Sequence, residues 1–140
     1  MADNQEYNNL VNERNRKQGQ YAACQNRIES VEYLLGRLRP AKAAVQELKK
    51  TFKTIRKEDA DLKKEKTEWK GDTYNMFSGK MYEVTATNDR YYTGSLDHVL
   101  DELNNEITRL ENKRMREHGL LGELGAAINS LANKIENFFN

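Results

Sequence analysis

The sequence has few of the residues that cross-link a chain, break a helix or bind a metal. Its 140 residues include one cysteine, one proline, one tryptophan and two histidines. The single Cys24 excludes an internal disulfide and is typical of a reducing compartment, where we expect it to be a small apolar filler. His98 and His118 have no partner ligands at a suitable spacing, and the acids beside His98 fit a solvated helix face. We expect no metal site.

Long apolar runs are also missing. No stretch approaches the roughly 20 apolar residues that span a membrane. The first residues, Met1–Glu6, have neither the basic region nor the apolar region of a signal peptide, so we expect no cleavable leader. We therefore expect a cytoplasmic protein, and export by a leaderless route within a complex stays open.

The sequence shows no arrangement typical of an enzyme. Gly119, Gly122 and Gly125 lack the preceding strand and the Lys-Ser/Thr pair of a phosphate loop, and helix packing explains them better. The two histidines and the cysteine share no local context that favours nucleophilic catalysis. The net charge of +1 gives no basic footprint for nucleic acid. We expect no enzymatic activity and no cofactor.

What the sequence does contain is helical periodicity. Charged residues make up 32% of the chain and the mean hydropathy is −0.96, values that suit long helices sharing a narrow apolar seam. Apolar residues recur at steps of three and four, which predicts an all-α fold. The first stripe is Tyr7, Leu10, Tyr21, Cys24, Ile28, Val31, Leu35 and Leu38, followed at heptad spacing by Ala41, Leu48, Ile55, Leu62 and Trp69, with Val45 and Phe52 beside them. The second is Leu96, Leu100, Leu103, Ile107, Leu110, Leu121, Leu124, Ile128, Leu131, Ile135 and Phe138.

A turn separates the two stripes at Trp69–Gly71. Glycine reaches backbone angles that other residues avoid, and the Asp72 and Thr73 that follow are residue types that cap a new helix. We predict one domain, residues 1–140, folded as a long antiparallel helical hairpin. Its first arm covers about 5–68, its turn 69–72 and its second arm about 73–138. Pro40 predicts a kink or a short break within Gly36–Pro40, and poor helix formers at 85–95 leave continuity open there.

Charge favours the same hairpin. Between Arg37 and Lys70 lie twelve basic and six acidic residues, and between Asp72 and Glu111 lie three basic and eight acidic ones. Folding at Gly71 places the basic stretch against the acidic one. Partner numbers should then sum to about 141 if both arms rise evenly, which sets Cys24 opposite Glu117.

The two arms are unequally apolar at their open end. The second arm ends in Leu121, Leu124, Ile128, Leu131, Ile135, Phe138 and Phe139, which we call the terminal stripe, whereas the facing arm offers mainly Tyr7, Leu10, Val11 and Tyr21. Exposed apolar stripes usually mark partner surfaces. We predict that the terminal stripe binds another helical chain or a second copy.

A long helix, Trp69-Lys70-Gly71 and a second long helix together resemble the small WxG helical-hairpin proteins of the type VII secretion system. The length, the lysine-rich run before the motif, Phe77 after it and the heptads through Leu110 are most similar to the WxG-like partners of LXG-domain toxins in Gram-positive bacteria. The resemblance spans essentially the whole chain. It assigns Trp69 and Gly71 as turn residues.

The resemblance implies a non-catalytic partner that binds the helical amino-terminal domain of a secreted LXG toxin. Such a partner helps present the toxin to the membrane-bound secretion ATPase, with a second small helical partner also conceivable. Family members with an export signal carry Tyr-x-x-x-Asp/Glu after the second helix, and no tyrosine here is followed by an acid at that place. This departure favours a subunit that travels with a signal-bearing partner.

The alternative is a structural coiled-coil homo-oligomer of a phage or cytoskeletal assembly, in which Trp69 only fills a turn. The sequence leaves open the identity of the partner, the stoichiometry and whether the protein is itself exported.

Overall fold

The computed structural model describes residues 2–65 and 71–140, and these residues are almost entirely helical. The first arm is the single helix α1 (Ala2–Glu65). The second arm is a succession of α2 (Asp72–Asp89), the π-helix η1 (Arg90–Leu96) and α3 (Asp97–Glu136). No strand occurs in these two ranges. The all-α helical hairpin predicted from the sequence is therefore confirmed.

Helix α1 passes through Pro40 without a break. One α-helical assignment covers Gly36–Pro40, so of the two alternatives predicted there, a kink or a short break, the short break does not occur. A proline inside a helix costs about 3 kcal/mol, which is comparable to the gain from burying one or two large apolar side chains nearby. Leu35, only 1% exposed, supplies such burial one turn earlier. The predicted kink region does coincide with a boundary, because the chain divides into two compact units between Gly36 and Arg37.

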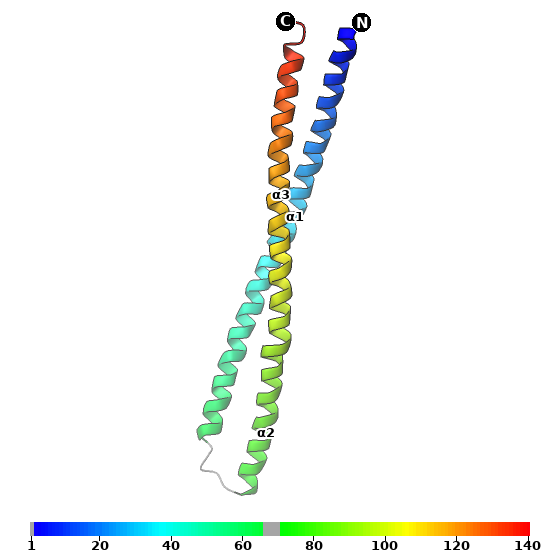
Figure 1. Cartoon of the computed structure of the whole chain (residues 1–140). Helices are drawn as coiled ribbons and strands as arrows, with labels where there is room; N and C mark the ends of the chain where they lie inside the picture. Colours follow the sequence, from blue (N-terminus) through cyan, green and yellow to red (C-terminus); the bar gives the residue numbers. More distant parts are fainter. Residues whose placement is uncertain (1, 66–70) are drawn as a thin grey trace. The chain divides into compact units, whose positions relative to one another are not determined.

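Unit 1 combines Met1–Gly36 with Thr108–Asn140. Within it, α1 and α3 run antiparallel and the two chain termini lie at the same end (Figure 1). Its core contains Cys24, Ile28 and Leu124, against which the partly buried Tyr21 and Leu121 pack. Val31, Leu35 and Leu110 are also buried. These are residues that the three-four spacing assigned to the seam.

Unit 2, Arg37–Ile107, pairs the second half of α1 with α2, η1 and the start of α3. Met81, Leu96 and Ile107 are buried on the second arm. On α1 the inward residues are half-buried and follow steps of three and four: Leu38, Lys42, Val45, Lys49, Phe52, Arg56 and Asp59. The seam therefore keeps the phase that it had before Pro40.

The heptad row that the sequence placed on this seam lies beside it. Leu48 is 45% exposed and Leu62 39%, Ala41 is exposed, and Ile55 is half-buried. Because the helix does not break, no change of phase brings these residues inward. Lysine and arginine occupy the seam instead, where their aliphatic stems cover apolar surface while their charged ends reach polar partners.

The two arms pair close to the expected register. Cys24 contacts Glu117, and Lys49 lies over the ring of Tyr92, as the sum of 141 requires. Near the termini the pairing is displaced, since Tyr7 contacts Phe138, four residues beyond its expected partner. The stretch where helix continuity was open stays helical but becomes a π-helix over Arg90–Leu96. Its i→i+5 hydrogen bonds accommodate more residues per turn than an α-helix does.

Candidate partner-binding site

Of the two predicted turn residues, Trp69 and Gly71, the structure describes only Gly71. Trp69 lies outside the described residues. Gly71 precedes α2 with φ 78° and ψ −154°, angles that favour glycine, and its carbonyl accepts a hydrogen bond from the Asn75 N–H at 3.1 Å. No side chain caps α2, so the expected capping by Asp72 is not seen. Asp72 is instead an acid in the first turn, where the helix dipole favours it.

The residues of the terminal stripe differ in exposure along α3 and past its end at Glu136. Leu124 is 6% exposed and belongs to the core with Cys24 and Ile28, and Leu121 packs against that core. Ile128, Leu131, Ile135 and Phe138 are half-buried, whereas Phe139 is 68% exposed. The first two residues of the stripe are therefore used within unit 1, and exposure is largest at its end. Partner binding by the stripe stays a prediction.

The facing part of α1 covers the stripe incompletely. Arg14 and Lys17 are half-buried there, at positions where the stripe of α1 has no apolar residue. The Nε of Arg14 is buried without a hydrogen-bond partner in the part of the chain that the structure describes. A buried donor without a hydrogen bond costs about 1–3 kcal/mol, so this stretch of unit 1 is destabilised by an unsatisfied donor.

Aromatic rings gather where the two ends of the chain meet. The Tyr7 ring centroid lies 5.8 Å from that of Phe138 and 5.2 Å from that of Phe139. The two phenylalanine rings are 4.9 Å apart and nearly perpendicular, a favourable edge arrangement. This cluster holds the carboxyl end against α1, while Phe139 itself stays 68% exposed.

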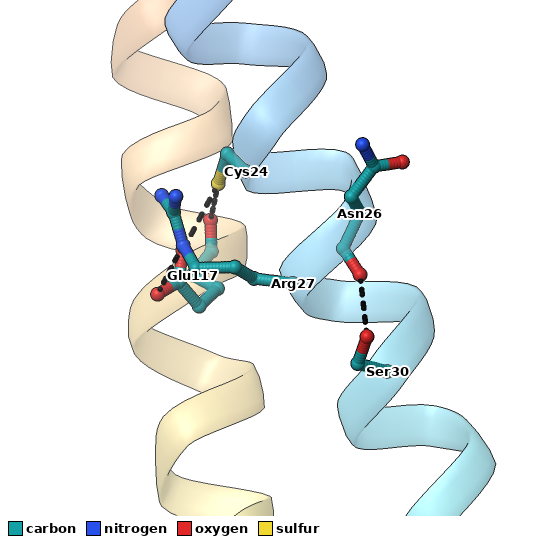
Figure 2. A network of polar contacts seen from close by, with 5 residues as sticks. All are labelled: Cys24, Asn26, Arg27, Ser30 and Glu117. Carbon is teal, nitrogen blue, oxygen red and sulfur yellow. Dashed lines mark hydrogen bonds and ion pairs between the residues drawn. The ribbon is translucent and has the colours of Figure 1, made fainter.

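A polar network occupies the centre of unit 1. The Cys24 thiol lies 3.1 Å from both the backbone carbonyl and Oε2 of Glu117, and Arg27 Nε donates to the two carboxylate oxygens at 3.0 and 3.1 Å (Figure 2). Burial, followed by the neighbouring Glu117, raises the pKa of the Cys24 thiol. The hydrogen bond from Cys24, helped by Arg27, lowers the pKa of Glu117. The carboxylate is thus held charged and the thiol neutral.

A second cluster, in unit 2, was missed by the sequence reasoning. Lys49 and Arg56 lie over the Tyr92 ring at 5.2 and 5.1 Å, within cation–π distance. Lys49 is also ion-paired with Asp97, which raises the pKa of the lysine, and Arg56 pairs with Asp89 at 2.6 Å. The two acids flank η1 on either side. The opposite net charges of the two arms were the available signal, but they did not identify the pairs.

The described residues offer no metal centre. They contain no group of three or more His, Cys, Asp or Glu side chains placed to hold an ion. His98 pairs with Glu102 at 3.6 Å on an exposed helix surface, and His118 lies 3.9 Å from Glu32. Among the described helices, none has the length and apolar character needed to cross a membrane.

Comparison with known proteins gives one positive result. A family model described as YwqH-like matches residues 12–133. No curated protein and no solved structure matches significantly. Because the matched region includes most of α1 and nearly all of the second arm, the chain belongs to the YwqH-like family.

Proposed function

We propose that this protein is a non-catalytic interaction protein of a type VII secretion system. In this role it binds the helical amino-terminal domain of an LXG toxin and helps present that domain to the secretion ATPase. Its resemblance to WxG-like hairpins, with Trp69 and Gly71 between two helical arms, supports the assignment. The absence of Tyr-x-x-x-Asp/Glu from the sequence favours a subunit that is exported, or presented, together with a partner carrying the signal.

The observation that carries the proposal is the incomplete cover of the terminal stripe. Ile128, Leu131 and Ile135 are half-buried and Phe139 is 68% exposed, while the first helix carries a half-buried arginine, Arg14, where its own stripe has no apolar residue. At about 25 cal/mol per square ångström, covering the remaining apolar surface would add substantially to stability. An amphipathic helix laid along the stripe provides that cover, in the manner of helix-in-groove recognition.

Co-expression tests the proposal. The full chain is produced with the amino-terminal helical domain of a toxin encoded beside it, and the two are co-purified through a tag on the toxin domain. We expect a stable complex, weakened by Phe139→Asp because the substitution places a charge in the apolar contact. Met115→Asp is the control, since Met115 is 69% exposed on α3 and lies outside the stripe, whereas Phe139 follows the end of α3 at Glu136.

Two results would contradict the proposal. One is failure to co-purify with the neighbouring toxin domain, together with unchanged toxin export after deletion of this protein. The other is a stable homo-oligomer, measured by sedimentation of the purified chain, that excludes the toxin domain. The second result would favour the structural coiled-coil alternative.

A further inference from the structure

Arg14 occupies an inward position of α1. The row of residues that faces α3 in this part of the helix has steps of three and four: Tyr7, Leu10, Arg14, Lys17, Tyr21 and Cys24. The Arg14 side chain is half-buried, as a position on this row requires. An arginine thus stands where the turns on either side carry a leucine or a tyrosine.

The middle of the terminal stripe lies opposite Arg14. Seven residues before Arg14, the Tyr7 ring contacts Phe138, with 5.8 Å between the ring centroids. Seven residues after it, a ring carbon of Tyr21 lies 3.7 Å from the place of a Cβ on Gly125. Because α1 and α3 run antiparallel within unit 1 and rise evenly, Arg14 faces the stretch midway between these two contacts.

The sequence around Arg14 offers it no acid at a suitable spacing. The positions three and four residues away on α1 are Leu10, Val11, Lys17 and Gln18. Across the seam, Leu124–Ile135 contains no aspartate or glutamate, and the adjacent Glu13 is paired with Arg16 at 2.6 Å. Arg14 Nη2 donates a long hydrogen bond of 3.4 Å to the Asn15 side chain, and its buried Nε has no hydrogen-bond partner within 2–65 and 71–140.

Unit 2 shows how the chain satisfies cations on its seam. Lys49 and Arg56 are half-buried on α1, and each is ion-paired with an acid of the other arm, Asp97 and Asp89 respectively. Arg14 has the same kind of position without such an acid. A guanidinium that is partly removed from water needs hydrogen bonds or an opposite charge. The group that would satisfy the open end of unit 1 is therefore a carboxylate.

We propose that the helix covering the terminal stripe carries an aspartate or glutamate within its own apolar stripe, and that this carboxylate pairs with Arg14. The inference rests on the proposed function and deepens it, because it names the chemistry of the partner at the same surface. A side-on carboxylate accepts hydrogen bonds from Nε and one terminal nitrogen together, and such charge-assisted pairs are the strong ones. Because Nε is covered in the free chain, the side chain turns toward the partner on binding.

A second copy of unit 1 is the wrong occupant. Two terminal stripes laid together would bring two Arg14 side chains and no acid, since Leu124–Ile135 has none in either copy. The carboxylate also makes the surface selective. A helix with an uncharged residue at that place leaves the arginine without its counter-charge, and a helix with lysine there adds a like charge.

Three labelled peptides test the inference on the full chain. Each is an amphipathic helix of roughly 21 residues, or about six turns, with leucine along one stripe. The central position of that stripe is glutamate, glutamine or lysine. We expect fluorescence anisotropy to show saturable binding of the glutamate peptide, about tenfold tighter than that of the glutamine peptide, with the lysine peptide weakest.

Two variants locate the preference. Arg14→Met removes the charge and keeps an unbranched side chain, so the preference for glutamate over glutamine should fall below about twofold. Arg16→Met is the matched control, because the Arg16 side chain is 61% exposed on the same helix and should leave the preference unchanged. Circular dichroism checks that both variants are helical, and Arg14→Gln replaces Arg14→Met if the methionine variant aggregates.

Several results would overturn the inference: equal binding of the glutamate and glutamine peptides, binding of none of the three, or a preference that survives Arg14→Met. So would a wild-type dimer in sedimentation that blocks all three peptides, because the stripe would then belong to a second copy. A toxin domain that fails to co-purify while the glutamate preference holds would contradict the proposed function alone. A toxin domain that co-purifies while the peptides show no such preference would contradict the inference alone.

Discussion

Cys24 and Glu117 face each other across unit 1, with the thiol sulfur 3.1 Å from both the carboxylate Oε2 and the backbone carbonyl of the glutamate. The sulfur is fully buried, and Arg27 closes the network from the solvent side. Cys24 and Glu117 are polar positions within the apolar stripes of the two arms, and they lie opposite each other. Because a shift of either helix would separate them, the contact favours one register over its neighbours.

Replacing Cys24 by alanine should destabilise the protein by about 1–2 kcal/mol, because it removes a buried sulfur and leaves Glu117 without one donor. Cys24→Ser keeps a hydrogen-bond donor. If the hydrogen bond contributes more than apolar packing, the serine variant should lose less free energy of unfolding than the alanine variant. Urea unfolding followed by circular dichroism measures both variants. A serine variant less stable than the alanine variant would show that apolar packing matters more than the hydrogen bond.

The Cys24 thiol should also resist modification in the folded protein. Burial raises its pKa above the ordinary value of 9.0, so at pH 8 it is neutral as well as inaccessible. We expect reaction with a thiol-specific disulfide reagent to be slow in buffer and fast in urea. The rate in buffer then reports opening of unit 1. Equally fast reaction in both conditions would contradict the buried position.

Stability should fall in acid through Glu117. Hydrogen bonding by Cys24 and Arg27 holds the folded pKa of Glu117 below the ordinary 4.5, so its contribution is fully present above that pH and is lost as the pH falls through the folded pKa. The difference in free energy of unfolding between the wild type and Glu117→Gln should therefore shrink between pH 7 and pH 3. Glu13→Gln is the control. The pKa of Glu13 is also lowered, but its partner Arg16 is exposed and such pairs contribute little.

Gly71→Ala should cost about 1–3 kcal/mol, because φ of 78° with ψ of −154° lies in a region that is essentially restricted to glycine. The cost is conformational, since a Cβ built at Gly71 meets no atom within 4 Å among the described residues beyond its chain neighbours. Gly119→Ala is the matched substitution inside α3, where a Cβ likewise meets nothing and alanine favours the helix. It should stabilise the protein by about 0.5–1 kcal/mol. Thermal unfolding distinguishes the opposite signs.

Leu96→Ala and Leu48→Ala should differ strongly although both leucines were assigned to the seam. Leu96 is 4% exposed and its loss should cost about 2–5 kcal/mol, whereas Leu48 is 45% exposed and its loss should cost less than about 1 kcal/mol. Urea unfolding of the two variants measures the difference. Similar losses would mean that Leu48 packs on the seam, as its heptad spacing suggested.

The contrast between these leucines shows how far the sequence could be interpreted. Periodicity and the Gly71 turn sufficed for the hairpin, and the arm lengths were enough to pair Cys24 with Glu117. Beyond Pro40, two rows on α1 have helical spacing, one of them apolar and the other carrying Lys42, Lys49 and Arg56. Counting apolar residues favoured the wrong row. The aliphatic stems of lysine and arginine also bury apolar surface, and a count that treats these residues as charged misses that contribution. Tyr92 lies within η1; the poor helix formers at 85–95 indicated an irregular stretch but did not predict a π-helix.

Phe138 and Phe139 should separate stability from binding at the carboxyl end. Phe138 is half-buried against Tyr7, so Phe138→Ala should lower stability measurably, by about 1 kcal/mol or more. Phe139 is 68% exposed, so Phe139→Ala should leave the unfolding midpoint nearly unchanged. If the terminal stripe binds a toxin domain as proposed, truncation of the exposed Phe139 should raise the dissociation constant about tenfold or more. Titration calorimetry measures the binding of both variants. A Phe139→Ala protein that binds as tightly as the wild type would remove the end of the terminal stripe from the interface.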